Sequence, residues 1–314
     1  MKLSRRRFMT ISACLAVAGA ACPTNAKTVS WRGVALGAEA KLIITGMPET
    51  EARRLIRLAL GEIDRLEDIF SLYRADSRLC LLNSKGVLQS PPPELLSTLS
   101  QVDAVHTATG GLFDPTVQPL WRAFAECGGR PDPKHVRSAR GKIGWCHVRY
   151  GMREIEFDRP GMQLTLNGIA QGFVTDRISA LLRSEGLENA VVNMGEISTL
   201  GHRPGGAGWR VGLTVNGDEA PTDFVEMKNR CVATSAPLAT TFDGTNSHIL
   251  SPITGRPVGS RWRRVSVVHR SAAIADGLST AAVMMDEQQL AECMEKVAQV
   301  TVNARRCDGT LLAI

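Results

Sequence analysis

The spacing of apolar residues predicts five helices. Apolar side chains recur every three or four positions over 48–70, over 93–109 and over about 169–184, and proline or glycine marks an end of each stretch. Two further helical patterns follow near the C-terminus, at 275–285 and 287–300. Extended structure is expected in the segments between these helices.

Short apolar-rich segments between the helices predict strands. They lie at 41–45, 190–193, 209–215, 224–227 and 265–268. Asn216-Gly217 follows the third of them and is typical of a hairpin turn. No repeat of fixed period and no low-complexity block interrupts this alternation, so we expect one compact unit of the α/β or α+β class.

The first 26 residues have the composition of an export signal. Three arginines and a phenylalanine at 5–8 precede a short apolar run at 11–21, and small residues follow it. The paired arginines resemble a twin-arginine signal. We therefore expect residues 1–26 to be removed and the mature chain, 27–314, to be located in the periplasm.

Two alternatives for this segment stay open. Cleavage after Ala26 and cleavage nearer Ala21 both fit the small residues present. Cys22 is a candidate for a lipid, although Gly19 stands where such sites prefer a larger apolar residue. A membrane contact is expected only through this lipid or through a partner protein, since no stretch reaches 18 consecutive apolar residues.

Removal of the signal changes the charge of the protein. The full chain has 37 Lys and Arg against 31 Asp and Glu, a net charge of +6. Lys2 and the three arginines leave with the signal, so 33 basic residues face 31 acidic ones and the mature charge is +2. A domain so close to neutral lacks the basic surface of a nucleic-acid-binding protein, and that class is excluded.

Motifs for several common chemistries are missing from the sequence. There is no G-x-G-x-x-G after a strand, no phosphate-binding P-loop and no H-E-x-x-H. Six cysteines remain in the mature chain without a C-x-x-C pair, so zinc ribbons and thioredoxin chemistry have no support. The pairing of these cysteines is left open.

Two segments rich in glycine follow or open a predicted helix. At 109–117, two glycines, Phe113 and Asp114 come directly after a helix, where main-chain N–H groups and an aromatic ring can meet a ligand. At 166–173 a strand enters a helix through glycine, an arrangement suited to phosphate. The structural alternatives are a helix C-cap with an Asp-Pro turn, and a tight turn with Asn167 as the helix cap.

Two later segments offer acid–base and metal chemistry. His248 lies among small polar residues at 245–257, where it is either an acid–base group or simply solvated. Asp276 and Thr280 are four residues apart, so on a helix they share a face and form a hard-oxygen pair suited to Mg²⁺. The alternative has Asp276 as a helix N-cap and Thr280 packed inward.

Taken in order, these segments resemble the ApbE family of FAD:protein FMN transferases. The matching motifs are Leu36-Gly37, Ser71-Leu72-Tyr73 with Ser77 and Asn83, Thr109 to Thr116, Gly168 to Gly172, Val192 to Gly195, Thr234-Ser235, Ser247 to Gly255 and Ala275 to Thr280. They cover essentially the whole mature chain. The resemblance implies one domain over 27–314 with an α+β fold, in which two related α/β subdomains enclose the flavin site.

The resemblance also implies an activity and a set of residues. The enzyme would use Mg²⁺ to cleave FAD, attach FMN through its phosphate to a Thr or Ser of an acceptor flavoprotein, and release AMP. By similarity, the metal ligands are the Gly168 main-chain oxygen, Asp276 and Thr280, and His248 activates the acceptor hydroxyl. The positions that align with FAD contacts are Leu36, Tyr73, Leu112, Phe113, Asp114, Thr165, Gln171, His248 and Ile249.

The sequence departs from the family pattern at four positions. Thr165 stands in place of Asp, Gln171 in place of Lys, Glu196 in place of the second glycine of a Gly-Gly pair, and Ala236 in place of Gly. The first two changes remove one acid and one base near the cofactor. FAD affinity or rate can differ as a result.

With its twin-arginine signal, this divergent core resembles the NosX branch, which is associated with nitrous-oxide reductase maturation in denitrification. The acceptor there would be a membrane flavoprotein of the NosR type. Two other functions remain open: an FAD pyrophosphatase that passes FMN to water, and a periplasmic FAD-binding carrier or assembly factor. The presence of Asp276, Thr280 and His248 favours the transferase.

Overall fold

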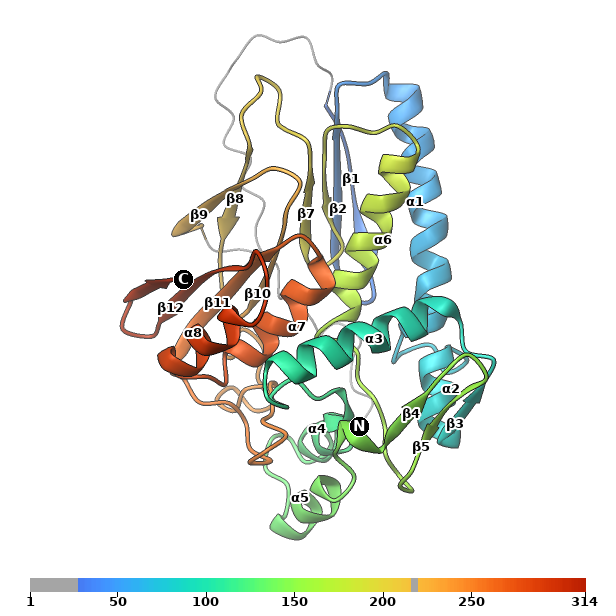
Figure 1. Ribbon diagram of the computed structural model, residues 1–314, viewed down its shortest axis with the longest axis vertical. Coiled ribbons are helices and arrows are strands. Elements are labelled where there is room, and N and C mark those ends of the chain that lie inside the picture. The colour runs from blue at the N-terminus through green and yellow to red at the C-terminus, as the bar shows by residue number, and fades with distance from the viewer. Residues whose placement is uncertain (1–27, 216–219) are drawn as a thin grey trace.

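The computed structural model describes residues 28–215 and 220–314. The predicted export signal and the Asn216-Gly217 turn lie outside these residues. Helices and strands alternate along the described chain, as Figure 1 shows from blue to red. None of the described helices is long and apolar enough to cross a membrane.

The centre of the fold is an eight-stranded sheet in the order β1-β2-β6-β7-β10-β11-β12-β13. Every neighbouring pair is antiparallel, which confirms the α+β class rather than the parallel sheet of an α/β protein. Its strands are β1 (Thr28–Ala35), β2 (Ala38–Thr45), β6 (Ala190–Asn193), β7 (Ile197–Leu200), β10 (Cys231–Ser235), β11 (Trp262–His269), β12 (Thr301–Arg306) and β13 (Leu311–Ala313).

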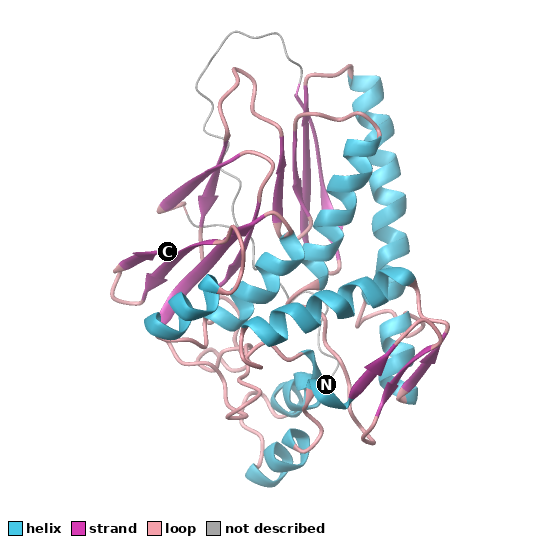
Figure 2. Ribbon diagram, viewed as in Figure 1, coloured by secondary structure: helices cyan, strands magenta, loops and turns pink. Residues whose placement is uncertain are grey.

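Both faces of the central strands are covered. Helices α1 (Glu49–Phe70), α6 (Ala170–Ser184) and α7 (Ala272–Ala282) lie along one face (Figures 1 and 2). A hairpin of β8 (Trp209–Leu213) and β9 (Asp223–Met227) packs its apolar side chains against the other face. Burial on both sides explains why β6, β7 and β10 have no exposed residue and show no alternation of polar and apolar positions.

The rest of the chain forms a smaller region beside the helical layer. The long helix α3 (Pro93–Ala108) borders it, and a three-stranded sheet of order β3-β5-β4 lies within it. Its other elements are α2 (Arg78–Lys85), β3 (Val87–Gln89), α4 (Gln118–Glu126), α5 (Pro133–Arg140), β4 (Val148–Tyr150), β5 (Glu154–Phe157) and short 3₁₀ helices at Pro115–Val117 and Trp145–His147. The last helix, α8 (Glu287–Glu295), lies outside this region, beside α7 (Figure 1).

A buried carboxylate joins two of the central helices. Asp176 of α6 accepts hydrogen bonds from the Ser271 hydroxyl at 2.7 Å and from the main-chain N–H groups of Ala272 and Ala273 at 2.8 and 3.1 Å. These N–H groups begin α7 and have no partner within their own helix. Asp176 therefore fixes the start of α7 against the side of α6.

The predicted helices are confirmed, with shifted bounds in the last two. The helix predicted at 275–285 spans 272–282, and the final helix ends at Glu295 and not at 300. Gln299, with a φ of +57°, lies in the connection that follows it. Helices α2, α4 and α5 were not predicted. Each has only eight or nine residues, too few for a clear apolar period. The six described cysteines are all free thiols.

Candidate functional site

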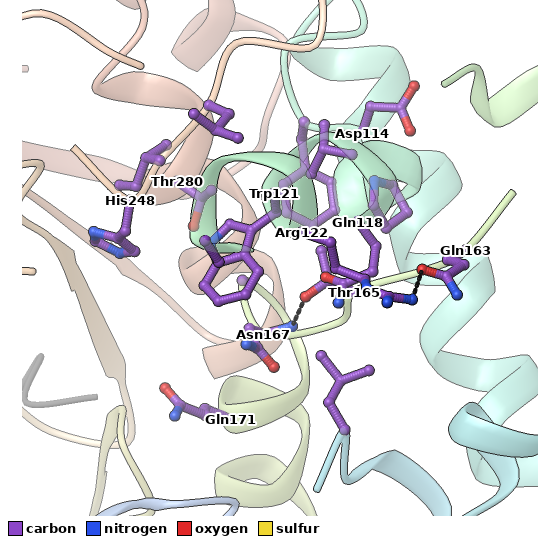
Figure 3. A pocket seen from close by; sticks show the side chains of 18 of the residues that line it. Asp114, Gln118, Trp121, Arg122, Gln163, Thr165, Asn167, Gln171, His248 and Thr280 are labelled. Atoms are coloured by element: carbon purple, nitrogen blue, oxygen red, sulfur yellow. Dashed lines mark hydrogen bonds between the residues drawn. The ribbon is translucent and has the colours of Figure 1, made fainter. Parts of the chain in front are cut away.

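A cavity of about 580 Å³ lies where the central helices meet the smaller region. Its lining brings together most of the residues that the sequence singled out, which come from distant parts of the chain (Figure 3). These are Tyr73, Leu112, Phe113, Asp114, Thr165, Gly168, Gln171, His248, Ile249, Asp276 and Thr280. Leu36 lines a small adjoining cavity instead, together with Tyr73 and Gln171.

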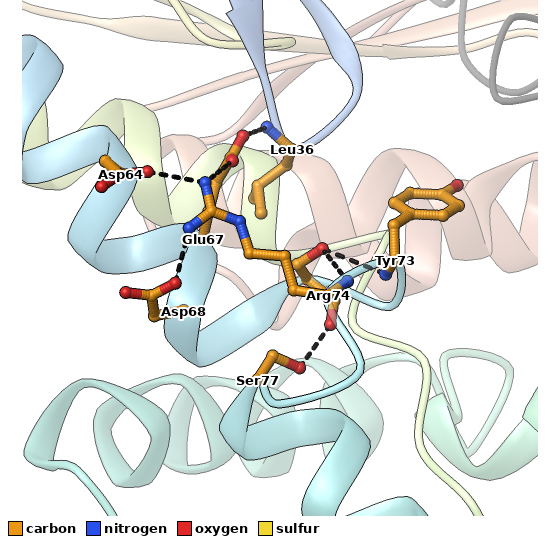
Figure 4. Close-up of polar contacts among 8 residues, drawn as sticks. Leu36, Asp64, Glu67, Asp68, Tyr73, Arg74 and Ser77 are labelled. Atoms are coloured by element: carbon orange, nitrogen blue, oxygen red, sulfur yellow. Dashed lines mark hydrogen bonds and ion pairs between the residues drawn. The ribbon is translucent and has the colours of Figure 1, made fainter.

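A hydrogen-bonded loop after α1 positions Tyr73 (Figure 4). The Ser71 hydroxyl accepts hydrogen bonds from the main-chain N–H groups of Tyr73 at 3.0 Å and Arg74 at 3.1 Å. The Ser77 hydroxyl donates to the Ser71 carbonyl at 2.6 Å and also caps α2. The serines of this motif thus shape the turn that presents Tyr73, whose side chain is 44% exposed, to the cavity.

An ion-pair cluster connects this loop to Leu36. Arg74 binds the carboxylates of Asp64, Glu67 and Asp68 on α1, and the main-chain N–H of Leu36 donates to Glu67 at 2.8 Å. Leu36 has a φ of +49°, so it forms the tight turn between β1 and β2. Its place in the adjoining cavity is therefore fixed from α1.

The side chains of Phe113 and Asp114, in the segment at 109–117, are more buried than the sequence indicated. The Phe113 ring is only 4% exposed and packs close to Gly168, so it offers little open surface. Asp114 uses both carboxylate oxygens locally, since one accepts from the Thr116 N–H and hydroxyl and the other from the Trp145 N–H. The structure thus gives Asp114 a turn-stabilising role at the wall of the cavity.

The glycine-marked turn at 166–173 carries the start of α6 into the cavity. The alternative of Asn167 as the helix cap is wrong, because α6 is preceded by Ile169 and has no side-chain cap. Thr165 is held by its N–H, which donates to the Pro115 carbonyl at 2.8 Å. A Cβ at Gly168 would lie 2.9 Å from the Thr280 hydroxyl oxygen, so glycine lets this turn approach α7.

Gly172 allows α6 and α7 to touch through their backbones. A Cβ there would lie 2.3 Å from the Ala272 carbonyl oxygen and 2.6 Å from the Ala273 Cα. The close approach lets the Gly172 N–H reach the Asp276 carboxylate at 3.3 Å. The alternative of Asp276 as an N-cap is wrong, since Ser271 caps α7 and Asp276 lies inside the helix.

A second buried carboxylate, Glu196, lines the same part of the cavity. Asp276 and Glu196 are each 4% exposed. Burial raises the pKa of Asp276, and burial together with the negative charge of Asp276 raises the pKa of Glu196 well above its usual range. Two acids that face one low-dielectric space cannot both ionise without a compensating positive charge.

The predicted metal ligands form a small oxygen-only set. Among the described residues no group of three His, Cys, Asp or Glu side chains is arranged to hold a metal ion. Asp276 offers one carboxylate, and Thr280 offers a hydroxyl at the cavity wall beside Gly168. Few hard oxygen donors in a cavity with room for a phosphate suit Mg²⁺, which keeps several water or substrate ligands, so these residues fit this ion.

His248 is held in one orientation by the main chain. Its Nδ1 lies 2.8 Å from the Thr240 carbonyl oxygen, which can only accept a hydrogen bond. The neutral ring therefore carries its proton on Nδ1, and Nε2 is left with a lone pair. Burial lowers the pKa of His248, although the carbonyls of Thr240 and Pro237 oppose the shift, so the ring favours the neutral form that can take a proton.

Helix α4 supplies cavity residues that sequence reasoning missed. Gln118, Trp121 and Arg122 line the cavity, and Arg122 binds Glu126 at 3.0 Å and Gln163 at 3.4 Å on the side away from His248 (Figure 3). The available signal was the amphipathic pattern of this short helix, whose Leu120 and Phe124 are buried.

Comparisons with known proteins agree on one family. The chain is 28% identical to the FAD:protein FMN transferase of Vibrio cholerae, over 91% of this chain and 89% of that protein. It is 25% identical to the FAD:protein FMN transferase of Salmonella typhimurium, over 84% and 80% of the two chains. Among solved structures, the flavin transferase ApbE from Vibrio cholerae has a TM-score of 0.79 at 26% identity, covering 92% of this chain and 97% of that one.

The apo form of the Pseudomonas stutzeri flavinyl transferase ApbE has a similar fold, with a TM-score of 0.80 at 22% identity over 93% and 97% of the chains. The sequence profile of the ApbE family matches residues 36–303, which include the cavity and every segment on which the family resemblance rests. The chain therefore belongs to the ApbE family.

Proposed function

We propose that this protein is a Mg²⁺-dependent FAD:protein FMN transferase. The observation that carries the proposal is the gathering of His248, Asp276 and Thr280 around one cavity. Its volume of about 580 Å³ is in the range of small-molecule sites, roughly 300–1,000 Å³. Relatives that bear this activity in their names match most of the chain, which supports the same chemistry here.

The reaction that we propose is a single displacement at phosphorus. The hydroxyl oxygen of a Thr or Ser on the acceptor protein forms a bond to the phosphorus on the FMN side of the FAD pyrophosphate. The bond from that phosphorus to the bridging oxygen breaks, and AMP leaves with the electron pair. The proton of the acceptor hydroxyl passes to Nε2 of His248, the ring nitrogen that holds a lone pair.

The other residues of the cavity hold the reactants. Asp276, Thr280 and the Gly168 main-chain oxygen would bind Mg²⁺, which when present neutralises pyrophosphate charge and stabilises the leaving phosphate. Apolar side chains such as Leu72, Trp121 and Ile249 provide the wall for the flavin and keep water away from the phosphorus. Exclusion of water favours transfer to protein over hydrolysis.

The test is a transfer assay with the purified mature chain, FAD, Mg²⁺ and a candidate acceptor domain. Flavin fluorescence on the denatured acceptor and released AMP are both measured. His248→Gln is expected to lose about 10²- to 10⁴-fold in transfer rate when FAD is saturating. AMP without labelled acceptor would instead indicate an FAD pyrophosphatase, and FAD binding with neither product would indicate a carrier.

We further propose that the protein works in the periplasm on a NosR-type acceptor in denitrification. The arginine-rich start of the chain and its departures from the family pattern support this. Replacement of Arg5 and Arg6 by Lys is expected to leave the protein in the cytoplasmic fraction and to abolish flavin labelling of the acceptor in cells. Periplasmic protein in that variant would contradict the export route.

A further inference from the structure

Glu196 is placed in the cavity by the turn between β6 and β7. Gly195 has a φ of +107°, and a Cβ on it would lie 2.7 Å from the Gln171 side-chain oxygen. The main-chain oxygen of Glu196 accepts a hydrogen bond from the Thr175 hydroxyl at 3.0 Å. The backbone of Glu196 is thus anchored to α6, and its side chain, 4% exposed, lines the cavity.

The Glu196 carboxylate is only half satisfied by the protein. Oε2 accepts one hydrogen bond, from the Thr234 N–H at 3.2 Å. Within residues 28–215 and 220–314, Oε1 has no hydrogen-bond donor and no ion-pair partner. The Asp276 carboxylate likewise accepts one hydrogen bond, from the Gly172 N–H at 3.3 Å.

No Lys or Arg of the described residues forms an ion pair with either of these two acids. Among the described cavity residues, the one Lys or Arg is Arg122, and its guanidinium binds Glu126 and Gln163 instead. A buried carboxylate without a cationic partner is unfavourable, because it loses hydration and gains no compensating charge. Two of them around one space are stabilised by a ligand of charge +2.

Glu196 also adds to the ligand set that the family resemblance implies. That set contains a main-chain oxygen, one carboxylate and one hydroxyl, and Glu196 is not part of it.

We propose that Glu196 contributes its carboxylate to the divalent cation site of Asp276 and Thr280, as a further metal-binding residue. The proposal rests on the proposed function for the identity of the cation. A second carboxylate raises the charge complementarity of the site toward Mg²⁺, so this protein binds the cation before FAD brings its phosphates. With Asp276 as the only carboxylate, cation binding would depend more on the phosphates of FAD.

The test is a calorimetric titration of the flavin-free mature protein with MgCl₂, repeated with Mn²⁺ and followed by electron paramagnetic resonance. Glu196→Gln keeps the side-chain size and an oxygen for the Thr234 N–H. We expect it to weaken Mg²⁺ affinity by about tenfold or more. Glu226→Gln is the matched control, because Glu226 also accepts one main-chain hydrogen bond but lies outside the cavity.

Thermal unfolding without metal separates this role from a structural one. Glu196→Gln removes a like charge next to Asp276 and is expected to melt at or above the wild-type temperature while it loses the cation. If Glu196→Gln misfolds, Glu196→Ala is the second variant, and we expect the same loss of Mg²⁺ affinity.

Wild-type Mg²⁺ affinity in both Glu196 variants would overturn the proposal, and so would a flavin-free wild type that binds neither cation. The FAD transfer assay is independent of these outcomes. Transfer by a protein whose Glu196 variants bind Mg²⁺ normally would leave the proposed function standing.

Discussion

Replacement of Gly172 by Ala tests whether the contact of α6 with α7 holds the site together. The added methyl group would point at the Ala272 carbonyl, 2.3 Å from its oxygen and 2.5 Å from its carbon. Both atoms belong to the backbone, so no side-chain rotation relieves the clash. The two helices must move apart, and α7 carries Asp276 and Thr280 with it.

The size of the effect follows from this distance. A carbon and a carbonyl oxygen meet at roughly 3.3 Å, so the helices must separate by about 1 Å. Overpacking of this kind costs typically 1–3 kcal/mol, and a shift of two backbones belongs at about the upper end. Alanine is about 1 kcal/mol better than glycine inside a helix. The expected net loss in the free energy of unfolding is therefore about 1–2 kcal/mol.

Urea unfolding followed by circular dichroism measures this loss, with Gly61→Ala as the control. Gly61 lies in α1, is exposed, and would have no atom within 4 Å of a new Cβ. The control is expected to gain up to about 1 kcal/mol from helix propensity. Gly172→Ala should also bind Mg²⁺ and FAD more weakly, since the Gly172 N–H leaves Asp276. Equal stabilisation by both substitutions would refute the reasoning.

Two further predictions concern charged groups. Asp223→Asn leaves the Arg264 guanidinium, whose side chain is 1% exposed, without its anionic partner. We expect the free energy of unfolding in urea to fall by about 3–5 kcal/mol. A decrease below about 1 kcal/mol would contradict this. The raised pKa values of Asp276 and Glu196 make the metal-free protein bind more protons folded than unfolded, so their contribution to stability is complete below about pH 4 and is lost as pH rises. Glu196→Gln should therefore gain stability relative to wild type between pH 5 and pH 8 in EDTA, and a constant difference across this range would exclude the linkage.

Local patterns in the sequence were enough for the long elements, and the family resemblance supplied most of the cavity residues. The period of apolar residues located α1, α3, α6 and α7, since each buries a stripe several turns long. The strand order was not accessible, because β2 pairs with β6 across more than a hundred residues of intervening chain. Pairing at that separation depends on the packing of the whole domain.

Two parts of the site were missed, one because it depends on tertiary contacts and one because its helix is short. Glu196 was visible as a departure from a glycine pair, but its approach to Asp276 requires the contact of β7, α6 and α7. Trp121 lies on a helix too short for a clear period. Asp114 lines the cavity as expected, and the structure adds that three neighbouring donors bind its carboxylate oxygens, which the sequence did not indicate.

The cap that Asp176 places on α7 has a consequence for how the protein opens. The hydrogen bonds from Ser271, Ala272 and Ala273 end on a side chain of α6, so α7 cannot unwind from its first turn without releasing α6. Amide protons of the two helices are therefore expected to exchange together and slowly, at a rate set by global unfolding. Local openings are then expected at the short helices α4 and α5 rather than at α7, which carries Asp276 and Thr280.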